Sequence, residues 1–74
     1  MGLKSSPIFS GIKLVARNPE RSMTEEALFY AARHGWITAE EKTNYTFLMG
    51  RRLPWVRRAR AKINAKVLEA AGLT

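Results

Sequence analysis

Helix-boundary signals divide this chain of 74 residues into short segments, and they limit its fold more than any other feature. Ser22–Glu25 and Thr38–Glu41 each place a hydroxyl side chain three residues before a glutamate, which is the pattern of a capping box at the start of a helix. Gly35, Gly50 and Gly72 stand where left-handed C-caps of helices are expected. These signals predict short helices joined by tight links.

Three helices follow from these signals. We expect the first over about Thr24–His34, with Thr24 as an alternative to Ser22 as its cap, and the second over about Ala39–Met49. The third begins at Pro54, since proline suits a first helical turn, and ends before Gly72. Its apolar positions keep a spacing of three and four residues, which predicts one buried stripe. The stripe consists of Val56, Ala59, Ile63, Val67 and Ala70.

The first 22 residues contain turn and breaker residues at short intervals, among them Pro7, Gly11 and Pro19. We therefore expect an irregular, flexible N-terminal arm over residues 1–22, followed by a three-helix domain over residues 23–74. The predicted fold class is all-α. The arm is expected to serve partner binding and to be dispensable for folding. Its expected contact residues are Ile8, Phe9, Lys13 and Arg17.

The amino-acid composition restricts the cellular compartment and the kinds of site that we expect for this chain. It contains no cysteine, so neither a disulfide nor a thiolate metal site can form, which fits a reducing cytoplasm. No apolar run approaches the roughly 20 residues that a membrane-spanning helix needs. We therefore expect a cytoplasmic protein without a membrane partner, and a monomer in the free state.

Positive charge is concentrated in the last third of the chain. Residues 1–50 carry six Lys or Arg against five Glu, a net charge of +1, whereas residues 51–74 carry seven against one, a net charge of +6. A field of this size repels itself unless it meets phosphate or an acidic protein surface. The imbalance predicts a polyanionic partner.

The third predicted helix and the link before it should make the contact. Most surface helices mix charges of both signs, but this one offers almost no compensating acid. Arginine also forms bidentate bonds with phosphate and carboxylate groups. Trp55 lies among these arginines and fits either partner contact or packing at a helix junction. The predicted contact residues are Arg51, Arg52, Trp55, Arg57, Arg58, Arg60 and Lys62.

Catalysis is not expected from this sequence. His34 is the single histidine, and aspartate is absent. Both glutamate pairs fall in first helical turns, where carboxylates complement the helix dipole. No nucleophile, base and orienting group can be assembled from these residues, and no metal-ligand or phosphate-loop motif is present. We expect a non-enzymatic protein without cofactor or metal.

Two other binding modes fit part of the pattern. A helix-turn-helix alignment on Gly50 puts Arg51 where an apolar residue is usual, and an alignment on Gly35 puts Glu41 in the core. The chain also has no glutamine and only three asparagines to read adenine. A DNA-binding repressor or excision-type protein that uses the basic helix over residues 54–71 is the alternative function. A basic inhibitor that mimics a host peptide is a third.

The whole layout resembles the small regulators of host RNA polymerase made by lytic bacteriophages, such as the transcription inhibitors and antiterminators of phages that infect Xanthomonas. The resemblance rests on the apolar Pro7–Phe9, the small helical domain and the basic Gly50–Arg58. It implies binding to bacterial RNA polymerase subunits near the RNA exit channel, in the host cytoplasm. It further implies inhibition of initiation, antitermination, or both. Contact with the RNA or DNA backbone is a further expectation, and the resemblance assigns no role to a single residue.

Overall fold

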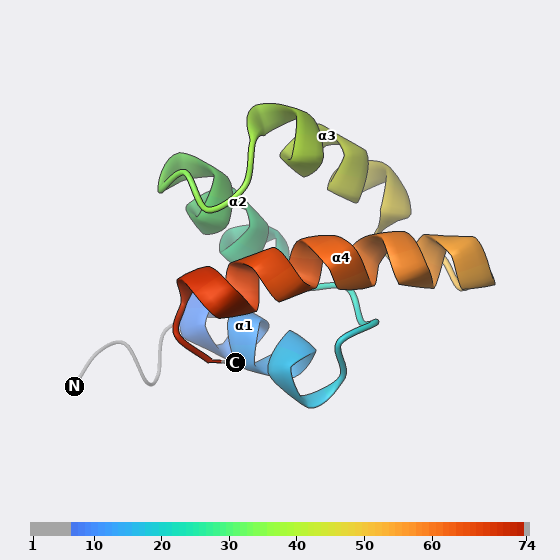
Figure 1. Cartoon of the computed structure of the whole chain (residues 1–74), viewed down its shortest axis with the longest axis horizontal. Helices are drawn as coiled ribbons and strands as arrows, with labels where there is room; N and C mark the ends of the chain where they lie inside the picture. The colour runs from blue at the N-terminus through green and yellow to red at the C-terminus, as the bar shows by residue number, and fades with distance from the viewer. Residues whose placement is uncertain (1–6, 74) are drawn as a thin grey trace.

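The computed structural model describes residues 7–73, and that part contains four helices and no strand (Figure 1). The helices are α1 (Pro7–Arg17), α2 (Glu25–Arg33), α3 (Ala39–Leu48) and α4 (Pro54–Ala70). Helix α4 is the longest and packs on α1 along one side and on α3 along the other. Helix α2 packs on both α1 and α3, which closes the arrangement. The predicted all-α class is confirmed, with four helices in place of three.

Helix α3 begins as the sequence predicts. The backbone N–H of Thr38 donates to Glu41 Oε1 (2.8 Å), and the N–H of Glu41 donates to Thr38 Oγ1 (3.0 Å). This reciprocal pair is a complete capping box. Lys66 of α4 also binds the Glu41 carboxylate (2.7 Å). That hydrogen bond, followed by the one from the Thr38 backbone, lowers the pKa of Glu41.

Helix α2 begins at the alternative cap. Thr24 is its N-cap, and its Oγ1 accepts a hydrogen bond from the Ala27 N–H (3.2 Å). The capping box expected at Ser22 is wrong, because the Ser22 hydroxyl binds the Gly50 N–H instead (2.9 Å). Gly50 itself has a φ of 75°, the left-handed conformation predicted for it.

The irregular arm predicted for residues 1–22 is wrong over Pro7–Arg17, which form α1. Residues 1–6 of the predicted arm lie outside the described residues. Ile12 and Val15 are buried on the inner face of α1, and Ile8 packs against the same core. A spacing of four and three residues places these side chains on one helical face. The helix therefore belongs to the domain that the sequence predicts to begin at residue 23.

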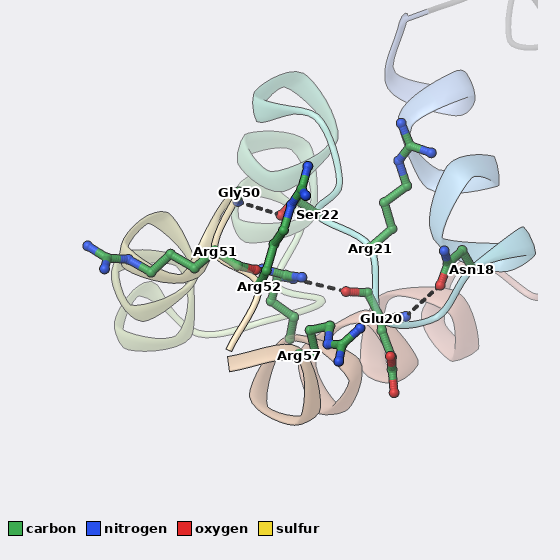
Figure 2. A pocket seen from close by; sticks show the side chains of 9 residues that line it. Asn18, Glu20, Arg21, Ser22, Gly50, Arg51, Arg52 and Arg57 are labelled. Atoms are coloured by element: carbon green, nitrogen blue, oxygen red, sulfur yellow. Dashed lines mark hydrogen bonds between the residues drawn. The ribbon is translucent and has the colours of Figure 1, made fainter. Parts of the chain in front are cut away.

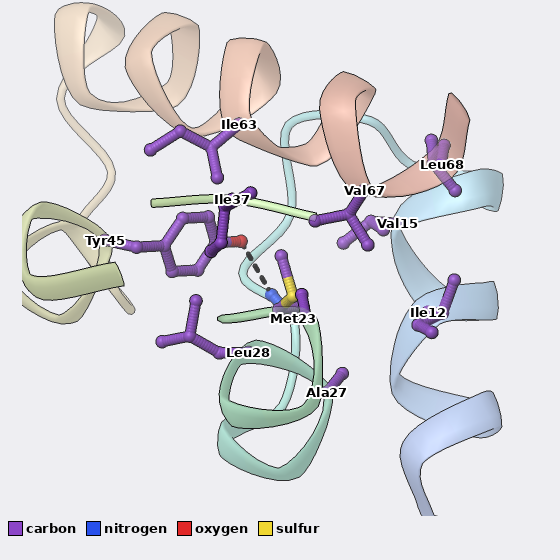
Figure 3. Close-up of a cluster of buried hydrophobic side chains, with 11 residues drawn as sticks. Ile12, Val15, Met23, Ala27, Leu28, Ile37, Tyr45, Ile63, Val67 and Leu68 are labelled. Atoms are coloured by element: carbon purple, nitrogen blue, oxygen red, sulfur yellow. Dashed lines mark hydrogen bonds between the residues drawn. The ribbon is translucent and has the colours of Figure 1, made fainter. Parts of the chain in front are cut away.

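All four helices contribute to one hydrophobic core (Figure 3). Ile63 and Val67 of the predicted α4 stripe lie within it, and Val56 is fully buried. Ala59 is half-buried and Ala70 is exposed, so the stripe is narrower than expected. The core cluster consists of Ile12, Val15, Met23, Ala27, Leu28, Ala31, Ile37, Tyr45, Ile63, Val67 and Leu68.

A buried polar network lies within this core. The Tyr45 hydroxyl donates to Asn64 Oδ1 (2.7 Å) and accepts from the Met23 N–H (2.9 Å). Asn64 Nδ2 donates to the backbone carbonyls of Pro19 (2.8 Å) and Arg21 (2.7 Å). Burial raises the pKa of the Tyr45 hydroxyl, so it stays protonated and can donate. The network attaches the segment between α1 and α2 to both α3 and α4.

Replacing Gly11 by alanine is expected to destabilise the protein by about 1–3 kcal/mol, the usual cost of overpacking a core. A Cβ at residue 11 would overlap Thr24 Oγ1 and lie 3.0 Å from Ala27 Cβ. Thr24 cannot turn away without losing the cap of α2. The clash outweighs the gain in helix propensity from glycine to alanine, which is about 1 kcal/mol.

Urea unfolding followed by far-UV circular dichroism measures this effect. Ser10→Ala is the matched control, because Ser10 is the exposed neighbour in the same helix. A Gly11→Ala protein as stable as the wild type would contradict the close approach of α1 and α2.

Candidate functional site

The link between α3 and α4 forms a corner that carries the predicted basic residues. Gly50 turns the chain at the end of α3, and Pro54 starts α4. The hydrogen bond from Gly50 to Ser22 holds the link against the segment that precedes α2. We call this region the α3–α4 corner and define it as residues 47–58.

Six of the seven contact residues predicted for the link and α4 are exposed: Arg51, Arg52, Trp55, Arg57, Arg58 and Lys62. Trp55 is 57% exposed, so it does not plug a helix junction. Two apolar side chains outside the predicted contact set are also exposed at the corner, Phe47 (67%) and Leu53 (54%). The α3–α4 corner thus places large apolar side chains among guanidinium groups.

The prediction that Arg60 is a contact residue is wrong, because Arg60 is only 5% exposed. Its Nε donates to the Glu20 carbonyl (3.0 Å), and its Nη1 donates to the carbonyls of Leu48 and Arg51 (both 2.6 Å). The guanidinium therefore joins α4 to the segment before α2 and to the end of α3. It is a structural residue, not an exposed contact.

The spacing of α4 explains this position. Arg60 follows Val56 by four residues and precedes Ile63 by three, so it lies on the buried face. That spacing was the sequence signal that could have identified it. Asn64 has the same spacing, since it stands four residues after Arg60 and three before Val67.

A cleft of about 600 Å³ opens between the segment before α2, the α3–α4 link and the first turns of α4 (Figure 2). Glu20 is its single acidic lining residue, and Ser22 supplies a hydroxyl. Arg21 was not among the predicted contact residues, since it is far from the basic helix in sequence. Five of the nine lining residues are arginines: Arg21, Arg51, Arg52, Arg57 and Arg60.

These arginines differ in direction. The side chain of Arg51 points away from the other labelled side chains in Figure 2, and its Nε donates to the Phe47 carbonyl (2.7 Å). Arg51 therefore satisfies the end of α3, where free carbonyls and the helix dipole favour a cation. The remaining four arginines and Glu20 leave the cleft with a strong positive excess.

No carboxylate neutralises this excess within the described part of the chain. The one ion pair found over residues 7–73 joins Lys66 to Glu41, outside the cleft. Arg60 binds only carbonyl oxygens, which carry no formal charge. The arrangement is suited to binding an anion.

The predicted arm residues do not join this cleft. Ile8 and Phe9 are half-buried in the first turn of α1, whereas Lys13 and Arg17 are exposed. The Lys13 ammonium lies 5.3 Å from the centre of the Phe9 ring, within cation–π range. Figure 1 places the start of α1 near the C-terminal end of α4 and away from the α3–α4 corner. The two predicted contact groups therefore form separate surfaces.

Comparisons with protein-family models, with curated proteins and with solved structures gave no match to this chain. None of the helices described over residues 7–73 is both long enough and apolar enough to cross a membrane. Over the same residues, no three acidic or histidine side chains gather in a group that could hold a metal ion.

Proposed function

We propose that this protein is a non-enzymatic transcription regulator that binds bacterial RNA polymerase through the α3–α4 corner. By this proposal it inhibits initiation, promotes antitermination, or does both, close to the RNA exit channel in the host cytoplasm. The observation that carries the proposal is the exposure of Trp55, Phe47 and Leu53 among arginines without acidic partners.

The residue types at the corner favour a protein surface as the main partner. Tryptophan and arginine are the residues that most often dominate the binding energy of protein interfaces. A purely phosphate-directed surface needs basic groups but no exposed leucine or phenylalanine. An acidic protein surface with apolar pockets would bind both the arginines and the exposed apolar side chains of the corner. The resemblance to phage regulators supports polymerase as that protein.

The DNA-binding alternative finds less support in this geometry. A recognition helix must present several polar side chains to base edges in the major groove. On α4, Arg60 and Asn64 are buried and already hydrogen-bonded to the protein. Exposed Arg57, Arg58 and Lys62 remain, and these suit phosphate better than a mixed base sequence.

Trp55→Ala is expected to weaken binding to purified bacterial RNA polymerase by about 30-fold, which corresponds to the roughly 2 kcal/mol of an interface hot spot. Phe29→Ala is the matched control, since Phe29 is an exposed aromatic residue on α2 (46% exposed). It should leave the affinity unchanged. Because Trp55 is exposed, both variants should keep the helical circular dichroism spectrum of the wild type.

The partner itself is tested by three affinities measured side by side near 0.15 M salt, the physiological ionic strength. They are those for polymerase, for a random-sequence duplex and for single-stranded RNA. We expect at least tenfold tighter binding to polymerase, about 1.4 kcal/mol. Transcription assays should then show loss of promoter initiation or increased read-through at a terminator. Tighter binding to a specific DNA site would instead support the repressor-type alternative.

A further inference from the structure

One nitrogen of the buried Arg60 guanidinium makes no hydrogen bond within residues 7–73. The carbonyls of Glu20, Leu48 and Arg51 occupy Nε and Nη1, and Nη2 donates to no acceptor in the described part of the chain. In that same part, no buried side-chain nitrogen or oxygen lacks a partner. Nη2 is therefore not completely buried, and Arg60 is one of the residues that line the cleft. Arg60, which is 5% exposed, thus keeps N–H groups that have no acceptor within residues 7–73.

Within residues 7–73, the charge of Arg60 also lacks a counter-ion. Burying an ion without an opposite charge is unfavourable, and carbonyl dipoles replace only part of the lost hydration. The Leu48 carbonyl lies at the C-terminal end of α3, where the helix dipole is negative, and it contributes one such dipole. An anion bound in the cleft would complete the compensation.

Further donors surround the same space. Arg52 from the link and Arg57 from α4 line the cleft, and Arg21 lines it from the segment before α2 (Figure 2). The Ser22 oxygen accepts from Gly50, which leaves its own proton to donate. Guanidinium groups match the oxygens of phosphate geometrically and stay charged at all physiological pH values.

We infer that this cleft is a phosphate-binding site that takes a backbone phosphate of a nucleic acid, with a single strand as the probe. No aromatic residue lines the cleft, so bases cannot stack within it and the site reads no sequence. Glu20 also lines the cleft, and its negative charge repels phosphate. This repulsion limits the number of phosphates that the cleft can hold. The inference does not rest on polymerase binding, because docking uses the exposed apolar residues of the corner and the cleft uses charged groups.

Two neighbouring arginines provide the test. Arg57 and Arg58 are both exposed in the first turns of α4, but only Arg57 lines the cleft. Arg57→Gln and Arg58→Gln remove the same charge, so a general electrostatic effect would weaken binding equally in both. We expect Arg57→Gln to weaken binding of a fluorescent octauridylate by about tenfold, in the range of a hydrogen bond to a charged group. Arg58→Gln should weaken it by less than about twofold.

Inorganic phosphate is the second probe, measured on the full chain at constant ionic strength. Phosphate should shift the Nε–Hε resonance of Arg60 and the amide resonance of Gly50 in a saturable way, and the same concentration of chloride should not. Phosphate should also compete with octauridylate. The Arg57→Gln protein should lose about 0.7 from its log–log salt slope for the single strand, the value of one phosphate contact.

Equal weakening by the two glutamine variants would overturn the inference, since it would show a diffuse field and no site. Saturable phosphate binding without competition from octauridylate would overturn the assignment to a nucleic-acid backbone. Trp55→Ala should leave octauridylate binding unchanged, because Trp55 does not line the cleft. The failure of polymerase binding and the failure of this site can therefore be told apart.

Discussion

A chain that lacks residues 1–17 is expected to lose its cooperative unfolding transition at 25 °C. Ile12 and Val15 of α1 are 3% and 0% exposed, and they close one side of the core. Burying one such side chain contributes about 1.5–3 kcal/mol, so the two together contribute about 3–6 kcal/mol. Whole domains are stable by only about 5–15 kcal/mol. Urea titrations followed by circular dichroism and by tryptophan fluorescence should show no shared sigmoidal transition.

A smaller change tests the same idea in a chain that still folds. Val15→Ala should destabilise the protein by about 2 kcal/mol, through the lost methyl groups and the cavity they leave. Lys13→Ala is the control on the exposed face of α1 and should stay within about 0.5 kcal/mol of the wild type. If the truncated chain unfolded with the wild-type midpoint, residues 1–17 would be an arm that the fold does not need.

Asn64→Leu is expected to destabilise the protein by about 3–5 kcal/mol, because each buried polar group left without a partner costs about 1–3 kcal/mol. Asn64 is 0% exposed and binds three groups from two other segments. Leucine has similar size but leaves the Pro19 carbonyl unpaired. It also leaves the proton of the Tyr45 hydroxyl only the longer contact to the Arg21 carbonyl (3.3 Å). Urea unfolding at neutral pH measures the change.

Asn44→Leu is the matched control, because Asn44 is exposed on α3. The double variant Asn64→Leu with Tyr45→Phe should be less destabilised than the sum of the single variants. The second change removes the hydroxyl whose hydrogen bond to Asn64 the first one breaks, so the two residues are energetically coupled. Strict additivity of the two effects would show that the hydrogen bond between them contributes little to stability.

Local interactions explain why the boundaries of α2, α3 and α4 could be predicted. A cap such as Thr38 with Glu41 lies within four residues, and a left-handed glycine needs no distant partner. The basic corner could be predicted for a similar reason, because charge can be counted along the chain. The exposure of Arg57 followed from its position outside the apolar stripe, and Arg52 lies in the link before the helix.

Helix α1 could not be predicted in this way. Gly11 weakens a helix when it is considered alone, and with Pro7 it indicated an irregular arm. The structure shows a different requirement: Thr24 and Ala27 approach residue 11 so closely that no Cβ fits. This requirement comes from the contact with α2, so the residues next to Gly11 in the sequence do not reveal it.

By itself, therefore, the sequence determined an all-α chain, the bounds of its three later helices and a basic surface at its C-terminal third. Tertiary structure decided that α1 belongs to the core, that Arg60 and Asn64 are buried, and that Arg21 joins the cleft. The physical reason is the range of the interactions involved. A helix cap joins residues that are close in sequence, and charge can be counted without knowing any contact. By contrast, Arg60 binds Glu20 across 40 residues, and Asn64 binds Pro19 across 45 residues. A buried cation is stable only where such distant carbonyls converge, and packing alone brings them together.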